Sequence, residues 1–391
     1  MTRLACDVLV AGAGLPGLAL AAALARQGLG VALADRSPVE VQDVDRSTWD
    51  ARVYAVSPGS VAFLESLGAW SAMPHERITA IESMRVEGDE GATMTFSAYE
   101  LGERALAWIV EERELRAALV RGVRDAGVNV LAPGGFARLA FAPRAATLAL
   151  DDGREVEAKL VVGADGVRSW IRQAAGIIAA PRPYAQTAVV ANFACERQHR
   201  GCARQWFRTD GGVLAWLPLP ERRISIVWSA PSALADSLMA LDARALADRV
   251  DGAGGHALGA LELITPALAF PLSYLRLPAA VAHRLALVGD AAHGVHPLAG
   301  QGVNLGFGDA QALATIINAR GPIDDPGTPV LLERYARRRA EPVLAVQTVT
   351  DGLARLFGSR APGLARLRNL GLAAVDRLPI AKHLLAQPAL R

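Results

Sequence analysis

A long uncharged stretch, residues 8–25, lies near the start of the chain and changes its pattern halfway. A short apolar run comes first, Gly12, Gly14 and Gly17 then interrupt it, and a run rich in Ala and Leu follows. A strand, a tight turn and a helix account for this pattern better than a signal peptide or a membrane span, because glycines and a proline break the apolar segment. With a second apolar run at residues 31–34, the pattern predicts a strand–helix–strand unit of a parallel sheet.

Further apolar runs predict that this sheet continues along the chain. A helical pattern over residues 111–126 leads to a short strand at 128–131. Two more buried strands are expected at residues 160–162 and 285–288, and each is followed by a glycine and an aspartate. The same arrangement of strand and polar glycine turn therefore occurs three times.

Two other regions have a different texture. Over residues 84–96 and 187–228, apolar and polar positions alternate often enough to predict antiparallel strands, which we interpret as a second domain inserted into the first. After Leu331 the pattern becomes helical and amphipathic. Breaks in this last helical region are expected at Pro342, Gly352, Gly358 and Pro362.

Composition narrows the function classes only modestly. The 391 residues carry 41 basic and 39 acidic side chains, a formal net charge of +2, with no long block of one sign. This balance points to no nucleic-acid partner. Cys6, Cys195 and Cys202 cannot all pair with one another and show no CxxC spacing, so we expect no disulfide framework and a reducing cytoplasm.

The first glycine turn has the chemistry of a dinucleotide site. Gly12 permits the tight turn, Gly14 lets the backbone approach a pyrophosphate, and Gly17 lets helix and strand pack closely. The N-terminus of the following helix supplies amide donors and the positive end of its dipole. Asp35, eighteen positions beyond Gly17, ends the second strand and can accept hydrogen bonds from an adenosine ribose. This segment predicts a bound dinucleotide without choosing between FAD and NAD(P).

The second and third turns each bring an aspartate to the end of a strand. Asp165 lies in the turn after residues 160–162 and Asp290 in the turn after residues 285–288. Taken alone, the second segment is as easily an ordinary connection from strand to helix. The third continues into an irregular loop, and Gly300 to Gly302 are expected to open a new helix that begins near Asn304.

In this order the three segments resemble those of the flavoprotein hydroxylases related to para-hydroxybenzoate hydroxylase. The resemblance implies that the first segment holds the ADP half of FAD, that Asp165 lies near the pyrophosphate and assists nicotinamide binding, and that Asp290 bonds the ribityl chain. It implies that Pro297 walls the side of the flavin where oxygen reacts. The residues expected at the reaction site are Pro297, Gly300 and Gln301. The residues expected to bind the cofactor are Gly12, Gly14, Gly17, Asp35, Arg36, Arg52, Arg113, Asp165, Asp290, Gly302, Val303 and Asn304.

Finer features resemble the ubiquinone-biosynthesis hydroxylases within that family. They lie at residues 50–57, 109–115, 333–342 and 367–372, and extend from near the first strand almost to the end of the chain. Arg52 and Arg113 stand where that branch places arginines close to the cofactor. Each is otherwise a solvated surface arginine. Where the branch often has Glu at the ribose position, this chain has Asp35, which keeps the same hydrogen-bonding chemistry.

The resemblance implies an α/β fold with a FAD-binding Rossmann-like domain, an inserted antiparallel β-sheet substrate domain and a helical C-terminus. We expect the FAD-binding domain to be discontinuous, over residues 1–72, 104–180 and 277–345. The substrate domain is expected over residues 73–103 and 181–276, and the C-terminal helical segment over residues 346–391.

The implied activity is that of an oxidoreductase, a monooxygenase that holds FAD, uses NAD(P)H as a transient reductant and O₂ as co-substrate, and hydroxylates an aromatic ring. The resemblance to the ubiquinone-biosynthesis hydroxylases implies a polyprenylated phenol of ubiquinone biosynthesis as the substrate. The inserted strands, which supply many apolar side chains and few charges, point the same way less strongly. A small soluble phenol or benzoate is the alternative. A flavin-binding assembly protein without turnover is the alternative of another class.

Two side-chain clusters have spacings that suit a metal ion. Asp290, His293 and His296 form one, but the flavin loop already accounts for them. Cys195, His199 and Cys202 form the second, which lacks a fourth ligand. We therefore expect no metal. The C-terminal helices are expected either to pack over the flavin domain or to contact a membrane surface or a biosynthetic complex, which would place the protein in the cytoplasm at the periphery of the inner membrane.

Overall fold

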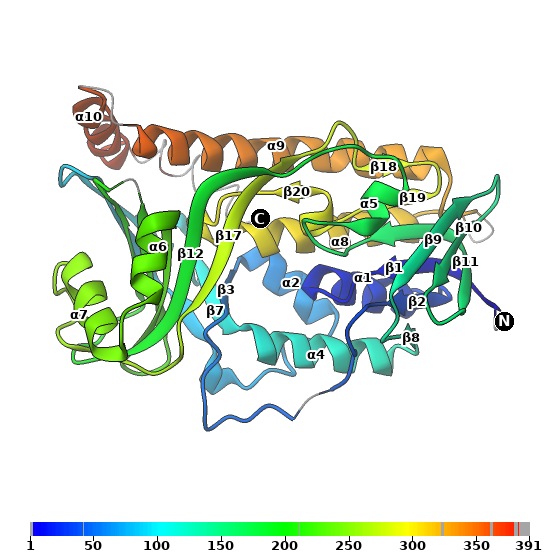
Figure 1. The fold of residues 1–391 in the computed structure, drawn as a ribbon, viewed down its shortest axis with the longest axis horizontal. Helices are drawn as coiled ribbons and strands as arrows, with labels where there is room; N and C mark the ends of the chain where they lie inside the picture. Colours follow the sequence, from blue (N-terminus) through cyan, green and yellow to red (C-terminus); the bar gives the residue numbers. More distant parts are fainter. Residues whose placement is uncertain are drawn as a thin grey trace.

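The computed structural model describes residues 3–41, 43–210, 212–321, 324–359, 363–378 and 382. Figure 1 shows a mixed α/β architecture in which a layered α/β region lies beside a large sheet, with one long helix, α9 (Pro329–Gly358), crossing above both. The predicted fold class is confirmed by this arrangement of sheets and by the C-terminal helices.

The first sheet begins with the predicted strand–helix–strand unit. β1 (Arg3–Ala11), α1 (Leu15–Arg26) and β2 (Val31–Ala34) follow one another, and β1 pairs in parallel with β2 on one side and with β11 (Glu155–Gly163) on the other. Most of α1 is buried, as its run of Ala and Leu requires. The sheet order is β18-β19-β11-β1-β2-β8, with the hairpin β9–β10 attached to β11. Its further strands are β8 (Asn129–Leu131), β9 (Phe136–Phe141), β10 (Ala146–Leu150), β18 (Val281–Ala282) and β19 (Leu285–Leu287).

Because β1, β11 and β19 are parallel neighbours, their carboxyl ends lie along one edge of the sheet. The three glycine turns that the sequence singles out therefore meet there. Helices α1, α4 and α8 pack together over this sheet. The helices of this region are α2 (Pro58–Ser66), α4 (Glu112–Asp125), α5 (Trp170–Ala174) and α8 (Gln301–Asn318), with the short helices η1 (His75–Arg77), η2 (Gly289–Ala291) and η3 (Leu298–Gly300).

The second sheet has the order β20-β17-β12-β15-β14-β13-β5-β6, with β16 beside β12. It is antiparallel as predicted, except that β5 and β13 pair in parallel. Two of its strands, β12 and β17, run along the molecule and connect the two regions (Figure 1). The strands are β5 (Ser83–Glu87), β6 (Thr93–Ser97), β12 (Arg182–Cys195), β13 (Cys202–Phe207), β14 (Val213–Leu219), β15 (Arg223–Pro231), β16 (Leu261–Leu263), β17 (Leu268–Arg276) and β20 (His293–Gly294).

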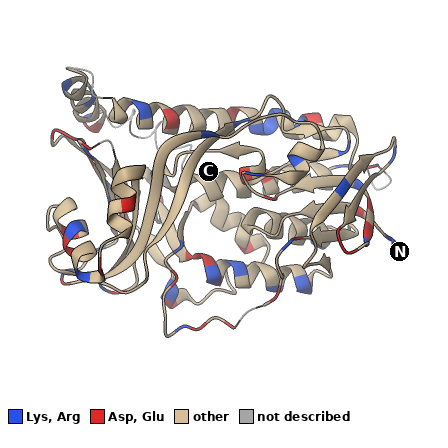
Figure 2. Ribbon diagram, viewed as in Figure 1, with Lys and Arg blue, Asp and Glu red and all other residues tan. Residues whose placement is uncertain are grey.

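One face of this second sheet is covered by α6 (Ser232–Met239) and α7 (Ala243–Ala253), which pack on Trp216 and Trp228. The tryptophans of β14 and β15 are thus core side chains. A small third sheet, β3 (Val53–Val56), β7 (Ala107–Glu111) and β4 (Thr79–Ile81), lies against the other face, and α3 (Ala98–Leu101) follows β6. Charged side chains gather on the outer helices and loops, whereas the long strands carry few (Figure 2).

The C-terminal region departs from the expected pattern. α9 runs unbroken from Pro329 to Gly358, so the breaks predicted at Pro342 and Gly352 are wrong. Pro342 lies on an exposed part of the helix, where water can satisfy the carbonyl that the proline leaves unpaired. The break predicted at Gly358 is confirmed, and the one at Pro362 lies outside the described residues. α10 (Leu364–Asp376) follows and contacts β6.

Candidate functional site

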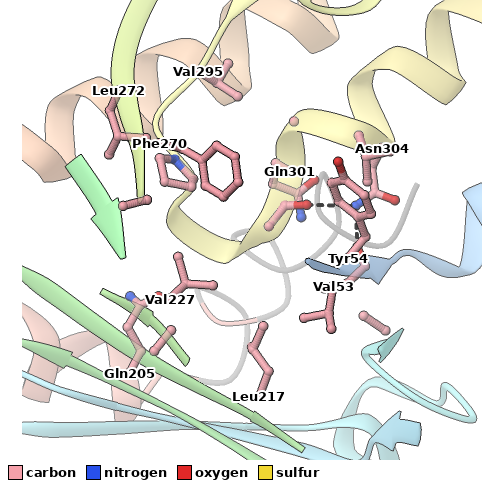
Figure 3. Close-up of a pocket in the computed structure, with 18 of the residues that line it drawn as sticks. Val53, Tyr54, Gln205, Leu217, Val227, Phe270, Leu272, Val295, Gln301 and Asn304 are labelled. Atoms are coloured by element: carbon pink, nitrogen blue, oxygen red, sulfur yellow. Dashed lines mark hydrogen bonds between the residues drawn. The ribbon is translucent and has the colours of Figure 1, made fainter. Parts of the chain in front are cut away.

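A cavity of about 1700 Å³ joins the edge of the first sheet to the open face of the second. All three glycine turns reach it, and so do β12 to β15, α9 and α10. Figure 3 shows the middle of this cavity, where Gln301, Asn304 and Tyr54 face Leu217 and Val227 across the open space.

The first turn has the geometry of a dinucleotide cradle. Gly12 has φ +114°, and a side chain there would collide with the backbone of Ala164. Gly14 is the N-cap residue of α1, and a Cβ at that position would meet nothing closer than 4.0 Å, so the cavity reaches the backbone. At Gly17 a Cβ would strike the carbonyl of Gly12. The three glycines therefore provide the tight turn, the open backbone and the close packing of helix and strand that a pyrophosphate site requires.

Asp35 supports this turn from the end of β2. One carboxylate oxygen accepts a hydrogen bond from the Ala13 amide at 2.6 Å and the other from the Ser37 amide at 2.7 Å. The side chain lines the cavity. Each carboxylate oxygen can accept a further hydrogen bond, so the acid can hold the turn and a ribose together.

Asp165 does not line the cavity itself. It caps α5, because its carboxylate accepts hydrogen bonds from the amides of Trp170 at 2.7 Å and Ile171 at 3.0 Å and from the Ser169 hydroxyl. Its neighbours Ala164 and Gly166 do line the cavity. In this structure Asp165 fixes the shape of the second turn.

Asp290 projects into the cavity from η2 at the end of the third strand. Although the side chain is open to the cavity, the surrounding protein raises its pKa, mainly by desolvation, against the opposing effects of His293 and Arg52. A group that donates a hydrogen bond to this carboxylate would favour its charged form and lower its pKa.

A buried ion-pair cluster, made of Asp309, His293 and Arg339, lies beneath this loop. The Asp309 carboxylate accepts from the Gly289 amide at 2.9 Å, contacts His293 Nε2 at 2.5 Å and accepts from Arg339 Nε at 2.6 Å. Burial alone would lower the pKa of His293, but Asp309 raises it overall. Burial alone would raise the pKa of Asp309, but His293 and Arg339 lower it overall. The cluster fixes the backbone beside Asp290.

The N-terminus of α8 opens onto the cavity. The helix begins at Gln301, three residues earlier than expected, because Gly300 adopts a left-handed conformation, with φ 63°, as its N-cap residue. Pro297, Gly300, Gln301, Gly302 and Val303 line the cavity. The first turn therefore presents its amides and the positive end of the helix dipole to the site.

Asn304, which also lines the cavity, ties α8 to neighbouring elements. Its Oδ1 accepts from the Ser57 amide at 2.9 Å, and its Nδ2 donates to the carbonyls of Ala55 at 2.8 Å and Gly300 at 3.2 Å. The side chain thereby locks α8 against β3 and the start of α2.

The three predicted arginines have different positions. Arg52 lines the cavity, donates to Tyr54 Oη at 3.0 Å and stacks over Phe270 at 5.4 Å. Arg36 and Arg113 are not among the cavity-lining residues. Arg36 stacks over Phe136 at 5.5 Å.

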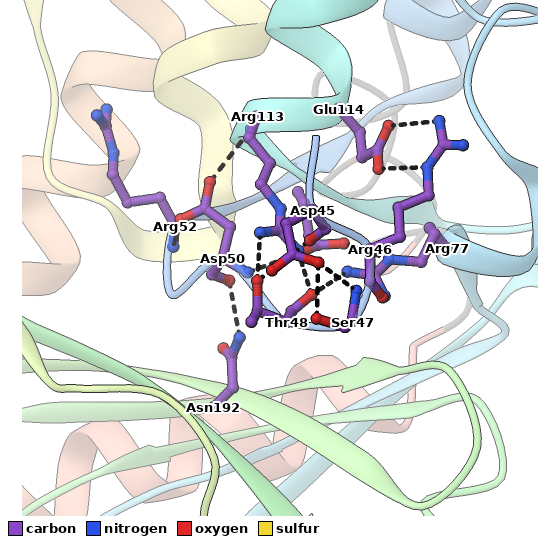
Figure 4. A network of polar contacts seen from close by, with 11 residues as sticks. Asp45, Arg46, Ser47, Thr48, Asp50, Arg52, Arg77, Arg113, Glu114 and Asn192 are labelled. Atoms are coloured by element: carbon purple, nitrogen blue, oxygen red, sulfur yellow. Dashed lines mark hydrogen bonds and ion pairs between the residues drawn. The ribbon is translucent and has the colours of Figure 1, made fainter. Parts of the chain in front are cut away.

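Arg113 belongs to a polar network that joins the two sheets (Figure 4). It forms an ion pair with buried Glu111 at 3.1 Å, and Arg77 binds the same carboxylate at 2.8 Å. The Asp50 side chain accepts from the Arg113 amide at 3.1 Å, and the Asp50 carbonyl accepts from Asn192 of β12 at 2.7 Å. This network positions the loop that carries Arg52.

Sequence reasoning missed several residues of the cavity. Arg116 lines it and donates to the Ala13 carbonyl of the first turn at 2.6 Å. Its position three residues after Arg113, on the same side of a predicted helix, was the available signal. Tyr54 lies within the segment 50–57, but only the fold shows that it faces the cavity, and Phe270 belongs to no motif.

Within the described part of the chain, no group of three His, Cys, Asp or Glu side chains is arranged to hold a metal ion. His293 is bound to Asp309, and His296 Nε2 lies 2.8 Å from Gln186 Oε1. Cys195 is buried, which raises its pKa to about 12.

Comparison with known proteins identifies the family to which this chain belongs. The model of the FAD binding domain family matches residues 5–350. The chain is 36% identical over 386 residues to ubiquinone hydroxylase UbiL of Rhodospirillum rubrum, covering 98% of this chain and 89% of the relative. It is 34% identical to 3-demethoxyubiquinol 3-hydroxylase of Escherichia coli, covering 98% of both, and 32% identical to human ubiquinone biosynthesis monooxygenase COQ6, covering 97% and 92%.

Solved structures agree in fold. P. aeruginosa PqsL in complex with 2-aminobenzoylacetate superposes with a TM-score of 0.77 at 26% identity, covering 94% of this chain and 99% of that chain. Klebsiella pneumoniae HpxO complexed with FAD and uric acid superposes with a TM-score of 0.74, covering 98% and 97%. At 19% identity, this second likeness concerns the fold alone.

Proposed function

Since the chain belongs to the FAD binding domain family, we propose that it is an FAD-dependent monooxygenase that hydroxylates the ring of a polyprenylated phenol in ubiquinone biosynthesis. One observation carries this proposal. A single cavity runs from a dinucleotide-binding turn, past a helix N-terminus, to an apolar sheet face. The relatives named for ubiquinone hydroxylation align over nearly the whole chain, so both halves of the cavity fall within the shared region.

FAD fits the polar half of the cavity. Gly12, Gly14 and the start of α1 would hold its pyrophosphate, and Asp35 its ribose. Asp290 would accept a hydrogen bond from the ribityl chain, and the first turn of α8 would face the pyrimidine end of the ring. FAD bound here would supply the redox chemistry, in which electrons from NAD(P)H activate O₂ and one oxygen atom is transferred to the substrate.

The residues of this chain orient the reactants and exclude water. Gly300 and Gln301 bring the amides of α8 to the site, where their fixed dipoles favour negative charge without reorganising. Pro297, which also lines the cavity, would wall the reaction side. Asn304 and the Asp309 cluster hold these elements in place.

The apolar half of the cavity suits a prenylated ring. Side chains from β5, β6, β13, β14 and β15 line it, and α9 and α10 continue it with further apolar residues. Each CH₂ group buried there contributes about 0.8 kcal/mol, so even a short prenyl chain adds substantial binding free energy. The apolar residues of these strands that line the cavity are Met84, Val86, Met94, Phe96, Ala203, Phe207, Ala215, Leu217 and Val227.

To test the proposal, cells lacking the corresponding ring hydroxylase are supplied with this gene, and their quinones are measured by mass spectrometry. Restored ubiquinone, together with NAD(P)H- and O₂-dependent hydroxylation of a prenylated phenol by the purified protein, is expected. Turnover of a small benzoate without restored ubiquinone would favour a hydroxylase of soluble phenols. Bound flavin without turnover of either compound would favour a non-catalytic flavoprotein.

The C-terminal helices provide a second surface, which we propose contacts an anionic lipid bilayer. Leu367, Leu370 and Leu378 are 66%, 67% and 57% exposed, and exposed Arg366 and Arg377 flank them. Leucines mixed with arginines suit the interface of a negatively charged membrane. Leu367 also lines the cavity, so its mouth would open at the lipid surface. No helix in the described ranges is both long and apolar enough to span a bilayer, which leaves surface contact as the proposed mode.

A further inference from the structure

One polar side chain stands in an otherwise apolar row across the second sheet. Strand pairing places one residue each from β12, β15, β14, β13, β5 and β6 next to one another, and all of them line the cavity. In that order they are Val190, Val227, Ala215, Gln205, Val86 and Met94. Gln205 is the member of this row whose side chain can form hydrogen bonds.

Gln205 is buried in the protein, yet its side chain opens onto the cavity. The residue is 6% exposed and lines the cavity. Figure 3 shows it on the same wall as Val227, with Gln301 on the opposite wall. Within the described ranges, neither atom of its side-chain amide has a hydrogen-bond partner, and neither belongs to the unpaired polar atoms that are sealed inside the protein. A molecule bound in the cavity can therefore reach this amide.

The packing of the sheet gives no reason for an amide at this position. The neighbours of Gln205 across the sheet, Ala215 and Val86, are apolar and offer no side-chain partner. A leucine of similar size would fill the same space, and it would avoid the free-energy cost of an amide that loses water without gaining a partner. Buried polar groups are nearly always paired, so an unpaired amide that faces a cavity indicates a ligand group.

The chemistry of the amide limits what that ligand group can be. The oxygen Oε1 accepts a hydrogen bond and the nitrogen Nε2 donates one, so a phenolic hydroxyl can pair with either atom. Because the amide carries no charge and takes up no proton, Gln205 can orient a ring but cannot act as its base. A ring without an oxygen substituent would displace water from the amide and leave it unpaired, which disfavours binding.

The row also offers space for an apolar substituent. From Gln205 it continues through Val86 on β5 to Met94 on β6, the strand that α10 contacts. Apolar side chains of α10 line the cavity at this end. A ring bonded to Gln205 therefore has an apolar path along which a prenyl chain can extend.

We propose that Gln205 is a specificity-determining residue whose amide forms a hydrogen bond with the hydroxyl group of the aromatic substrate and so sets which ring carbon is hydroxylated. This inference rests on the proposed function, since it names the residue that recognises the ring in the same cavity. A ring tethered through its hydroxyl cannot turn freely, so fewer of its carbons reach the reaction site.

The test of binding uses the FAD-loaded full chain and two probes, 2-geranylphenol and geranylbenzene, which differ only in the ring hydroxyl. Binding is followed by the change in flavin absorbance. The wild type should bind the phenol about tenfold more tightly, the effect of about one well-formed hydrogen bond. In Gln205→Leu the phenol should bind about tenfold more weakly, whereas geranylbenzene should bind at least as tightly as in the wild type, because no amide has to lose its water.

Product analysis tests the orientation of the ring. The wild type should hydroxylate 2-geranylphenol mainly at one ring carbon, whereas Gln205→Leu should give a mixture of products. Gln311→Leu is the matched control, because it makes the same change at an exposed glutamine of α8 that does not line the cavity. It should keep the wild-type affinities and the wild-type product.

The possible outcomes separate this inference from the proposed function. If Gln205→Leu keeps the wild-type preference and product while hydroxylation proceeds, the role of Gln205 is wrong and the proposed function stands. Equal weakening of both probes would also overturn the role of Gln205, since it would reflect a changed cavity shape. If the preference depends on Gln205 but the wild type forms no product, recognition by Gln205 stands and the proposed function fails. If the wild type binds neither probe, both are overturned.

Discussion

At the scale of single residues, Asp35 and Asp165 have similar positions in the sequence but different structural roles. Both follow a buried strand near a glycine turn. Asp35 faces the cavity and bonds the turn, whereas Asp165 turns inward and caps α5. The sequence placed both acids at the edge of the first sheet where the glycine turns meet. It could not tell which carboxylate reaches the cavity, because that depends on side-chain rotamers and on where α5 starts.

Asn192, which bonds the Asp50 loop, lies beyond what sequence reasoning could find. It belongs to no motif, and it is an ordinary strand residue until the register of β12 against β15 is known. Register depends on pairing between distant segments, and a slip of one residue would turn its side chain to the opposite face. The proposed roles of Arg36 and Arg113 remain predictions, since both lie outside the cavity lining.

The first prediction concerns Asp290, whose carboxylate faces the cavity at the end of the third strand. Asp290→Ala should weaken FAD binding by about 1.5–3 kcal/mol, because a charge-assisted hydrogen bond is lost. Titration of the apoprotein with FAD, followed by flavin fluorescence, measures this change. Asp290→Asn keeps an oxygen acceptor and should lose less. Unchanged FAD affinity in a folded Asp290→Ala protein would show that the ribityl contact lies elsewhere.

At the scale of elements, the sequence predicted the parts of the fold that rest on local pattern. The strand over residues 31–34 is β2, and the helix expected over residues 111–126 is α4. The glycine turns fell where predicted because each has a steric reason that neighbouring residues supply. The start of α8 and the continuity of α9 were missed, since Gly300 and Pro342 act through tertiary surroundings that a local pattern does not contain.

The Asp309 cluster connects three such elements and should give a characteristic pH dependence. His293 has a raised pKa in the folded protein, so its ion pair stabilises fully below about pH 6.5 and the stabilisation is lost as pH rises through the raised value. Asp309 has a lowered pKa, so its contribution is present above about pH 3.8 and is lost as pH falls through the lowered value. The cluster therefore stabilises most in the mildly acidic range between them.

Asp309→Asn should reduce the free energy of unfolding by about 3–5 kcal/mol near pH 6, because it leaves His293 and Arg339 as unpaired buried charges. Urea unfolding at several pH values measures this difference, which should shrink as pH rises and His293 loses its proton. His256→Gln is the control, since His256 pairs with Asp251 at the surface and its removal should cost little. A difference that stays constant from pH 6 to pH 9 would contradict the assigned protonation of His293.

At the scale of the whole molecule, the division into a discontinuous flavin domain and an inserted substrate domain stays a prediction. The two large sheets agree with its outline, yet β12, β17 and the network around Glu111 bind them closely together. The site lies between the sheets. Its two halves come from segments far apart in the sequence, which explains why the motifs predicted the flavin half and only composition hinted at the other.

The last element of this assembly, α10, has an inner and an outer face with different chemistry. On the inner face Asn369 donates to Asp89 at 2.8 Å, and Arg368 forms an ion pair with the same carboxylate. These contacts hold the helix on the turn between β5 and β6. They explain why polar residues interrupt the apolar run at 367–372, and they leave Leu367 and Leu370 pointing outward.

If this outer face contacts lipid, replacing Leu370 and Leu378, which do not line the cavity, by Ser should abolish sedimentation with vesicles that contain anionic phospholipid, because two exposed apolar anchors are lost. Turnover of a short-chain phenol in detergent-free buffer should remain within about twofold, since exposed polar substitutions rarely disturb folding. Replacing Val330, 66% exposed at the other end of the C-terminal helices, by Ser is the control and should leave sedimentation unchanged.

Truncation after Gly352 separates docking from packing, because a protein that no longer folds or binds FAD would show that the helices serve the core. Binding of the wild type to zwitterionic and anionic vesicles alike would mean that Arg366 and Arg377 do not contribute, and binding to neither would refute the membrane contact.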